Sequence, residues 1–406
     1  MSLLSSVSCA SSPSINNMDE SDTSLGPLNK IPDELRLKIL GNLGFNDLKN
    51  MREVCSQFSE LINDRLFCIA TGASMGVKAD TFVTLINEIK IKADNAITIW
   101  EAIKKQLDGS IISYPDFDEL KGKDKIFIIT EFDKWIDTNK DIINITELDL
   151  SNLDLKYLPS SIGNLNGLTK LDLSRNQITS VPKEIGNLSS LTELSLSNNQ
   201  ITSVPKEIGN LNGLTKLDLS WNQITSVPKE IGNLSSLKRL SLFYNQIISV
   251  PKEIGNLSSL TKLDLSLNQI TSVPKEIGNL RSLTELYLSN NQITSVPKEI
   301  GNLSSLKRLY LFYNQIISVP KEIGNLSSLK WLYLSDNQIT SVPKEIGNLN
   351  SLKWLYLSNN QITSVPKEIG NLSNLKLFYL RNNPIISLPI EIQSLSALQS
   401  LSVSKL

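Results

Sequence analysis

The sequence predicts an α/β solenoid, in which short parallel strands line a concave face, preceded by a small all-α domain. Three observations lead to this fold class. One motif recurs at a constant interval from about Ile145 to Leu406, which is typical of repeat architectures. Before Ile145, apolar residues recur at the spacing of helix faces. Hydrophobic residues make up 40% of the 406 residues, so the chain has enough apolar side chains for a large core.

The repeated unit is 23 residues long and reads L-x-x-L-x-L-S-x-N-Q-I-T-S-V-P-K-E-I-G-N-L-S-S. Its asparagine recurs without a slip at Asn176, Asn199, Asn222, Asn245, Asn268, Asn291, Asn314, Asn337, Asn360 and Asn383. This pattern resembles the leucine-rich repeat, whose units are about 20 to 29 residues long. It is most similar to the intracellular subclass with the L-P-x-E-I-G-N-L signature, found in Ras-associated and plant Ras-group proteins. The resemblance covers about Ile145–Leu406 and is specific for the fold.

Each consensus position has a physical reason. Leu171 and Leu173 are two residues apart and both point inward from a short strand. Asn176 ends that strand, and its amide can both donate and accept hydrogen bonds, so stacked asparagines are expected to satisfy backbone groups in the turn. Pro182 suits the start of a short helical segment, and Gly186 permits the bend back toward the next strand.

Both ends of the array look capped. Apolar residues at helical spacing between Lys125 and Lys140 predict an amphipathic helix that covers the open edge of the first repeat. At the other end, a twelfth strand is expected near Leu401, followed by a polar tail with Ser404 and Lys405. Such caps are needed because a repeat array otherwise exposes its core at both ends.

The outward residue between the two core leucines changes along the array and predicts a protein-binding surface. It is mostly aspartate or serine in the first half and tyrosine in the second half. Aromatic residues are enriched at protein-binding hot spots. The predicted target-binding residues are Tyr287, Tyr310, Tyr333, Tyr356, Tyr379, Trp331, Trp354, Phe312 and Tyr313, and the cations Lys307, Arg308, Lys330, Lys353 and Lys376 run alongside them.

Two alternatives to a protein-binding role stay open for these aromatic residues. Tyrosine pairs well across strands, and duplication in blocks of three repeats has copied it, as the near-identical repeats around Leu237 and Leu306 indicate. Aromatic residues beside lysines also suit a nucleic-acid groove. The acidic outward residues of the first half, such as Asp172 and Asp218, argue against nucleic acid.

The segment from Leu28 to Leu66 predicts a compact three-helix module. Pro32 suits the start of a helix, with Asp33 and Glu34 in its first turn. The order I-P-x-E-L, I-L-x-x-L, D-L and V-C-x-x-F-x-x-L-x-x-D resembles an F-box. Phe58 stands where that family often has tryptophan, and Ile31 stands where it usually has leucine.

The F-box resemblance implies a partner, a Skp-type adaptor that links the chain to a cullin-type ubiquitin ligase. The residues implied for adaptor binding are Ile31, Pro32, Leu35, Ile39, Leu40, Leu43, Leu48 and Val54. Alternatively, these residues form the core of a helical domain that packs only on its own chain.

The expected domain organisation has five parts. They are a disordered serine-rich tail at 1–24, an F-box-like domain at 25–69, a helical connector at 70–124, a cap helix at 125–144 and the solenoid at 145–406. The tail also resembles export signals of specialised bacterial secretion systems, and near-perfect repeats beside an F-box resemble effectors that intracellular bacteria deliver into host cells.

Composition excludes several function classes. The chain has no histidine, which rules out Ser-His-Asp and Cys-His catalysis and the commonest metal ligand. No glycine-rich phosphate loop is present, and no cysteine follows Cys68. We therefore expect no enzyme activity, no cofactor and no metal. The net charge of −1 gives no overall attraction to nucleic acid or an anionic membrane, and no stretch is apolar enough to span a membrane.

These observations predict a substrate-recognition subunit of a cullin-type ubiquitin ligase, with the concave repeats binding a target protein. The alternative is a non-enzymatic repeat scaffold, or a protein that binds a small GTPase, with no ubiquitin role. The three cysteines all precede the repeats, which favours a reducing cytoplasmic compartment, or the host cytoplasm for a secreted effector. Outside its complex the chain is expected to be a monomer.

Overall fold

The computed structural model describes residues 79–107, 114–123 and 125–403. The predicted F-box-like helices and the serine-rich tail lie outside these residues, as do Ser404 and Lys405 of the predicted polar end. The chain divides into two compact units. One unit holds residues up to Lys90 together with Lys123–Phe127, and the other holds Ile91–Gly122 and Ile128–Leu406. The second unit contains the repeats and is described below.

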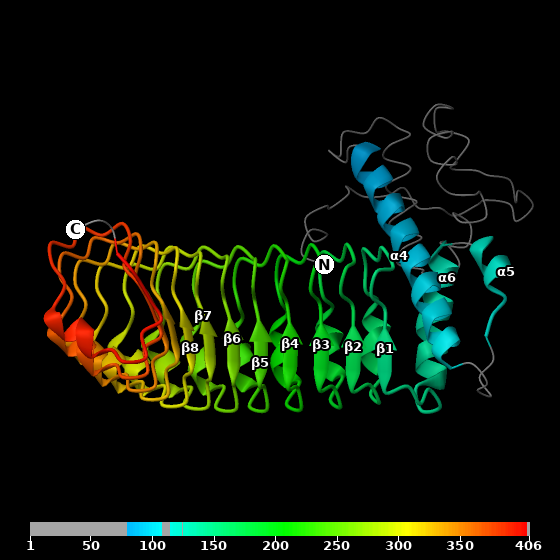
Figure 1. Cartoon of the computed structure of the whole chain (residues 1–406). Coiled ribbons are helices and arrows are strands. Elements are labelled where there is room, and N and C mark those ends of the chain that lie inside the picture. Colours follow the sequence, from blue (N-terminus) through cyan, green and yellow to red (C-terminus); the bar gives the residue numbers. More distant parts are fainter. Residues whose placement is uncertain (1–78, 108–113, 124, 404–406) are drawn as a thin grey trace, which may run out of the picture. The chain divides into compact units, whose positions relative to one another are not determined.

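The repeats form one parallel sheet of twelve strands in strict sequence order, β1 to β12, as the colours of Figure 1 show. Each strand is three residues long, and each pairs with the same three positions of the next repeat, for example Leu148 with Leu171. The strands are β1 Glu147–Asp149, β2 Lys170–Asp172, β3 Glu193–Ser195, β4 Lys216–Asp218, β5 Arg239–Ser241, β6 Lys262–Asp264, β7 Glu285–Tyr287, β8 Arg308–Tyr310, β9 Trp331–Tyr333, β10 Trp354–Tyr356, β11 Leu377–Tyr379 and β12 Ser400–Ser402. The predicted solenoid of short parallel strands is confirmed.

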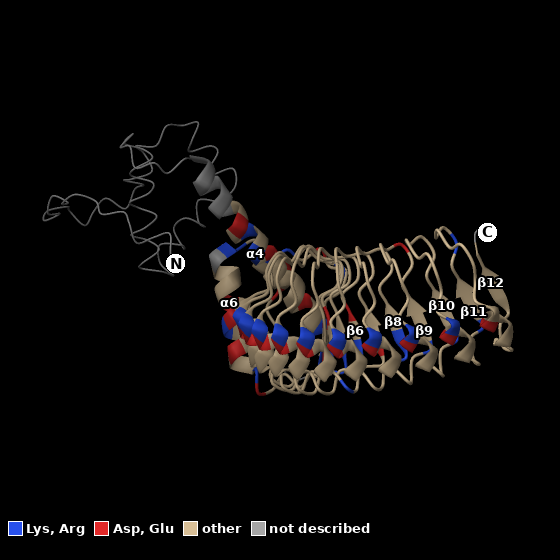
Figure 2. Ribbon diagram, turned by 90° about the vertical axis from the view of Figure 1, so that its left-hand side faces the viewer, with Lys and Arg blue, Asp and Glu red and all other residues tan. Residues whose placement is uncertain are grey.

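The helical segment of each repeat is a short 3-10 helix. These are η2 Ser160–Asn164, η3 Lys183–Asn187, η4 Lys206–Asn210, η5 Lys229–Asn233, η6 Lys252–Asn256, η7 Lys275–Asn279, η8 Lys298–Asn302, η9 Lys321–Asn325, η10 Lys344–Asn348, η11 Lys367–Asn371 and η12 Ile390–Ser394. The consensus proline precedes each helix, as Pro182 does with a φ of −66°. Lys and Glu begin η3 through η11, so blue and red segments alternate along the row of repeats in Figure 2.

Aliphatic side chains fill the space between the sheet and the 3-10 helices. Five aliphatic side chains of one repeat expose at most 1% of their surface; they are Leu191, Leu194, Leu196, Ile201 and Ile208. The following repeats bury the same positions. Every repeat therefore supplies its neighbours with the same apolar surface, which explains why the array is stable only as a stack.

The consensus asparagines form the predicted ladder. The Nδ2 group of Asn199 lies 2.9 Å from the carbonyl oxygen of Leu173 in the preceding repeat and 3.1 Å from that of Leu196 in its own. Its Oδ1 atom accepts the N–H of Ile178 at 2.9 Å. Because the side chain is buried, these bonds replace the water that the turn would otherwise need.

Three described helices precede the first repeat. They are α4 Ala79–Gln106, α5 Phe117–Lys121 and α6 Lys125–Asn139, and α6 lies where the sequence predicts a cap helix. In the second unit, Trp100 of α4 and Phe132 of α6 are fully buried with their ring centroids 5.5 Å apart. Asn95 of α4 accepts the backbone N–H groups of Lys156 and Tyr157 at 2.9 and 2.7 Å. Asn95 thus satisfies two backbone N–H groups of the first repeat beside the position of Leu155, whose N–H is accepted by Asn176 of the asparagine ladder.

At the other end of the array, β12 lies where the twelfth strand is predicted. Three apolar side chains are exposed near it: Ile386 at 85%, Ile390 at 73% and Leu401 at 38%. Ile390 stands where the other 3-10 helices of the array mostly begin with lysine. The predicted polar tail with Ser404 and Lys405 lies outside the described residues.

Candidate protein-binding face

The outward side of the sheet, which we call the strand face, is built from two columns of side chains. The first column holds the residue before the central leucine of each strand, and the second holds the residue after it. The central leucines themselves point into the core, for example Leu217 and Leu286. Strand pairing in register brings equivalent residues of neighbouring repeats side by side, so each column is continuous.

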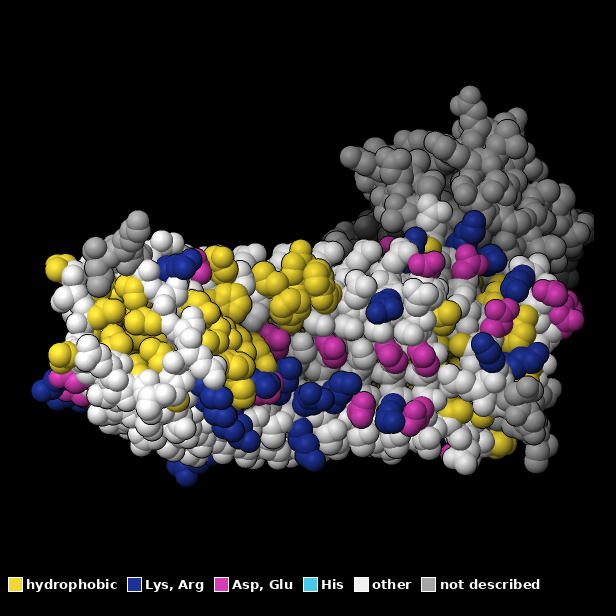
Figure 3. Space-filling view, viewed as in Figure 1, with side chains coloured by type: hydrophobic (Ala, Val, Ile, Leu, Met, Phe, Trp, Pro, Cys, Tyr) yellow, Lys and Arg dark blue, Asp and Glu magenta, His cyan; other side chains and the backbone are white. Residues whose placement is uncertain are grey.

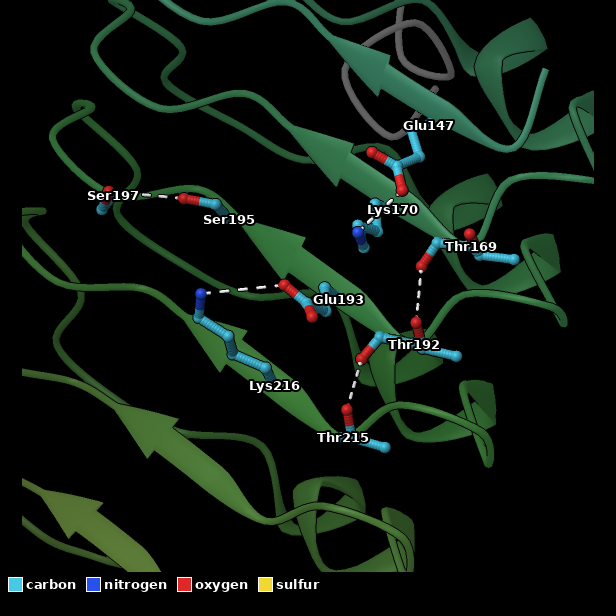
Figure 4. Close-up of polar contacts among 9 residues, drawn as sticks. All are labelled: Glu147, Thr169, Lys170, Thr192, Glu193, Ser195, Ser197, Thr215 and Lys216. Carbon is cyan, nitrogen blue, oxygen red and sulfur yellow. Dashed lines mark hydrogen bonds and ion pairs between the residues drawn. The ribbon is translucent and has the colours of Figure 1, made fainter.

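The first half of the strand face is polar and largely self-paired (Figure 4). Lys170 forms an ion pair with Glu147 at 2.7 Å, and Lys216 forms one with Glu193 at 3.7 Å. These residues line a shallow hollow of about 280 Å³ over β1 to β4. Beside the strands, the hydroxyl of Thr192 donates to the carbonyl of Thr169 at 2.9 Å. Each group has a partner within the chain, so this half offers few unsatisfied groups.

The second half of the strand face is aromatic (Figure 3). Its five tyrosines, which we call the tyrosine ladder, are Tyr287, Tyr310, Tyr333, Tyr356 and Tyr379. Neighbouring rings stack with centroid distances of 4.8, 4.4, 4.3 and 4.8 Å and interplanar angles of 24°, 10°, 9° and 3°. The rings cover one another's faces, and each side chain is half-buried. The ladder therefore presents its ring edges and hydroxyl groups outward.

Two tryptophans occupy the first column beside the ladder. Trp331 and Trp354 lie edge to face with ring centroids 5.1 Å apart. The guanidinium of Arg308 lies 4.6 Å from the ring centroid of Trp331 and is also paired with Glu285. Among the described residues, the buried indole N–H of Trp331 has no hydrogen-bond partner.

Burial in the ladder changes the acidity of its hydroxyl groups. Burial raises the pKa of Tyr287 to about 12, and the hydrogen bond that its hydroxyl donates to Glu285 adds to this effect. Burial also raises the pKa of Tyr310 and of Tyr333. These three hydroxyls therefore stay protonated at physiological pH. That of Tyr287 is engaged with Glu285, and those of Tyr310 and Tyr333 interact with neighbouring ladder tyrosines.

Aromatic side chains also gather at one rim of the strand face. Phe312 contacts the ladder, with its ring centroid 6.4 Å from that of Tyr310, and Tyr313 follows it, 55% exposed. A second cluster stands over β4 and β5, where Trp221 stacks on Tyr244 at 4.1 Å and Phe243 lies beside them.

We call Trp221, Tyr244 and Tyr313 the rim aromatics, and their backbone is unusual. Their φ angles are 56°, 55° and 53°, in the left-handed region. Asparagine, which tolerates this region best among residues with side chains, fills the same position in five repeats, for example Asn198 and Asn290. A bulky side chain there costs roughly 1 to 2 kcal/mol. Exposed aromatic rings at a strained position are typical of a binding surface rather than of a stabilised core.

The nine predicted target-binding residues therefore lie together, over β7 to β11. Trp221 is not among the predicted residues. Its repeat position, which is also that of Tyr244 and Tyr313, could have indicated it. The eight predicted adaptor-binding residues lie outside the described residues. Across the described part of the chain, no helix is long and apolar enough to cross a membrane, and no group of side chains is arranged to hold a metal ion.

Comparison with known proteins supports this architecture. The family model described as "Leucine-rich repeat region" matches residues 183–268, 229–321, 263–337 and 317–406, which together cover more than half of the chain. A second model, "Leucine rich repeat", matches residues 143–201. The model "F-box-like" matches residues 28–67. No curated protein matched the chain.

Solved structures give the same fold. A leucine-rich-repeat protein of Leptospira interrogans is 36% identical, with 75% of this chain and 86% of that chain covered and a TM-score of 0.56. The plant peptide hormone receptor RGFR1 in complex with RGF2 is 35% identical, with 59% and 40% covered and a TM-score of 0.55. The Arabidopsis receptor kinase HAESA, in complex with the peptide hormone IDA and the co-receptor SERK1, is 29% identical, with 64% and 46% covered and a TM-score of 0.56.

The chain spans less than half of each of these plant receptors but most of the Leptospira protein. The repeat model, the identity to the Leptospira protein and the unbroken twelve-stranded sheet all agree. The chain therefore belongs to the leucine-rich-repeat proteins, and it carries an F-box-like domain in front of its repeats.

Proposed function

We propose that this chain is a substrate receptor of a cullin-type ubiquitin ligase. In this proposal the F-box-like domain binds a Skp-type adaptor, and the strand face binds the protein to be modified. The observation that carries the proposal is the order of modules, an F-box-like domain at residues 28–67 followed by repeats. Catalysis belongs to the partners, and the chain contributes proximity between the ligase and its target. The proposed place of action is the cytoplasm.

The tyrosine ladder and the rim aromatics support the target-binding half of the proposal. A strand face that served only as a stable scaffold would gain nothing from strained, exposed rings such as Trp221 and Tyr313. The two plant receptors that resemble the repeats were solved in complex with RGF2 and with the peptide hormone IDA, which supports a peptide segment as the element recognised here.

The adaptor is tested by calorimetry of the purified chain with a Skp-type adaptor. The double variant Pro32→Ala, Leu35→Ala is expected to weaken binding at least tenfold, which is about 1.4 kcal/mol. The variant Lys38→Ala is the matched control, because it changes a charged residue of the same segment and leaves the apolar set intact.

The outcomes separate the two candidate functions. Tight binding that the double variant loses and the control keeps supports the receptor function. A folded chain that binds no adaptor contradicts the ubiquitin role and leaves a repeat scaffold with a protein-binding face. Circular dichroism of both variants establishes that the repeats remain folded.

A further inference from the structure

The margin of the strand face carries a row of cations beside the tyrosine ladder. Its four residues, Lys307, Lys330, Lys353 and Lys376, we call the lysine column. The backbone N–H of each donates to the carbonyl of the one before it, at 2.9, 2.9 and 2.8 Å. They therefore stand one strand apart in adjacent repeats. The same repeat position holds Thr169, Thr192 and Thr215 in the first half.

The lysine column is unneutralised, whereas four cations of the first column are paired. Lys170 and Lys216 pair with glutamates, and Lys262 and Arg308 share Glu285. No member of the lysine column forms an ion pair with any residue that the structure describes. Lys238, at the same repeat position as the lysine column, and its neighbour Arg239 also form no ion pair with any residue that the structure describes. Lys307 is exposed and the other three are half-buried. Four cations in one row, about 4.8 Å apart from strand to strand, attract a partner of opposite charge.

The opposite half of the strand face has a different character. Its second column carries the carboxylates Asp149, Asp172, Asp218 and Asp264. The first column of that half carries both signs, with Glu147 and Glu193 among Lys170, Lys216, Arg239 and Lys262. An acidic partner therefore meets mixed charge there and only cations along the lysine column, so the charge pattern favours the second half of the face.

The stacking of the tyrosine ladder argues for a protein partner rather than a nucleic acid. Single-stranded nucleic acids bind by stacking bases on aromatic faces. A base inserted between two rings requires them to stand about 7 Å apart, twice the roughly 3.4 Å rise of stacked bases. The rings are 4.3 to 4.8 Å apart, so their faces are already occupied by each other. Ring edges and hydroxyl groups suit apolar side chains and carboxylates instead.

The type of cation distinguishes carboxylate from phosphate. Phosphate groups are recognised best by the bidentate fork of arginine. Arg308, beside the first rungs of the ladder, is already paired with Glu285 and lies over Trp331. Arg381 is a single exposed arginine after the last rung, Tyr379. The lysine column offers single point charges, which suit carboxylates spaced along a chain.

We propose that the occupant of this half of the face is an acidic peptide segment of the target protein, lying across β7 to β11. Its carboxylates contact the lysine column, and its apolar side chains pack against the ring edges of the tyrosine ladder and Trp354. Four lysines span about 14 Å at the strand spacing, so a short segment is enough. This inference rests on the proposed function of the strand face and names the chemistry of its target.

The test measures fluorescence anisotropy of a labelled synthetic peptide that mixes Glu with Leu and Phe, titrated with the full chain. The double variant Lys330→Glu, Lys353→Glu reverses the central charges of the lysine column. The control variant Lys344→Glu, Lys367→Glu makes the same charge change in the same repeats, at the exposed first residues of η10 and η11. The milder variant Lys330→Gln, Lys353→Gln removes the charges without reversing them.

We expect the charge-reversed variant to bind the acidic peptide at least tenfold more weakly and the control to stay within twofold of the wild type. A peptide with Lys in place of Glu should show the opposite preference. Equal loss in the control, or tighter binding of oligouridine than of the acidic peptide, overturns the proposal. Absence of acidic-peptide binding in a chain that still binds the adaptor overturns it as well and leaves the receptor function intact.

Discussion

The buried asparagine of each repeat connects three stretches of backbone. Asn268 lies 3.0 Å from the carbonyls of both Leu242 and Leu265, and it accepts the N–H of Ile247. Replacing it with alanine leaves these buried groups without partners. Because an unsatisfied buried polar group costs roughly 1 to 3 kcal/mol, we expect Asn268→Ala to lower the free energy of unfolding by about 3 kcal/mol.

Urea unfolding followed by circular dichroism measures this loss. The control is Gln269→Ala, which changes the neighbouring exposed side chain and should change stability by less than about 0.5 kcal/mol. Equal losses for the two variants would mean that the asparagine ladder is not the source of the stability.

The tyrosine ladder makes stability depend on alkaline pH. The pKa of Tyr287 is raised to about 12 in the folded chain, above the value of about 10 expected in the unfolded chain. Between these values the unfolded state loses its proton first, so stability present below pH about 10 falls as pH rises toward about 12. Tyr287→Phe should fall less steeply across this window.

Denaturant unfolding at a series of pH values measures this slope, and tyrosinate absorbance reports when the ladder ionises. A slope that is the same in Tyr287→Phe and in the wild type would show that Tyr287 is not its source. The carboxylate of Glu285 faces this hydroxyl, and Arg308 lies close by, so the charges of both belong to the same equilibrium.

At the residue scale, the sequence predicts which residues stack on one another better than it predicts their backbone and ring conformations. The asparagine ladder follows from the period, because identical residues at identical positions must stack in a parallel array. The left-handed backbone of Trp221 does not follow from its own residue type, because tryptophan has no preference for that conformation. Only the asparagines at the same position of other repeats indicate it. The stacking of the tyrosine faces also depends on ring orientation, which no sequence pattern specifies.

The 3-10 helices η2 to η11 each carry one glycine where they pack closely on the next helix. A Cβ atom on Gly255 would lie 2.4 Å from the carbonyl oxygen of Glu276 in the next repeat and 2.8 Å from its Cβ. The backbone cannot give way without separating two repeats. We expect Gly255→Ala to cost about 1 to 3 kcal/mol of unfolding free energy, as overpacking usually does.

Gly213→Ala is the matched control, because its Cβ would lie 3.6 Å from the nearest atom, an ordinary contact. Thermal or urea unfolding of the two variants should separate them clearly. A Gly213→Ala variant as unstable as Gly255→Ala would contradict close approach as the cause, because Gly213 lies in the turn after η4 and has room for a Cβ atom.

At the element scale, strand positions were predictable and helix type was not. Leucines two residues apart indicate a strand. The segment Lys-Glu-Ile-Gly-Asn on the opposite side of each repeat is compatible with either an α-helix or a 3-10 helix, so its sequence did not decide the helix type. The tight contact at Gly255 and its equivalents reflects the short distance between the 3-10 helices of neighbouring repeats. The role of Asn95 was also hidden, because its partners Lys156 and Tyr157 are far away in sequence.

The whole array behaves as a stack of equivalent interfaces, so it should tolerate the loss of one complete repeat. Deletion of residues 191–213 removes one unit and joins Ser190 to Leu214, which preserves the pattern. We expect this variant to fold and to keep acidic-peptide binding over β7 to β11. Circular dichroism and peptide anisotropy check both expectations.

Deletion of residues 191–201, about half of one unit, is the control. It removes strand β3 and Asn199 of the asparagine ladder but keeps the following 3-10 helix η4, so the sheet and the helix row no longer match and the variant should lose cooperative unfolding. A control that folds as well as the complete deletion would contradict the stacking account.

For the whole molecule, strict periodicity gives the register, so the sequence predicted that the proposed target-binding residues lie together. Seven of the nine lie on the adjacent strands β7 to β11, and Phe312 and Tyr313 follow β8. Their charge surroundings were less predictable, since ion pairs such as that of Lys262 with Glu285 depend on side-chain placement. The adaptor-binding residues stay a prediction.

The identical pairing of all strands also has a genetic consequence. Phe243 and Tyr244 recur as Phe312 and Tyr313, after a block of three repeats. The strands on either side of this block pair with their neighbours in the same way. Unequal recombination within the gene can therefore add or remove a block of three without creating a mismatched junction. Where the block lies within the tyrosine-bearing repeats, such an event changes the number of rungs in the tyrosine ladder, so the length of the proposed binding surface can evolve by copy number while the fold is conserved.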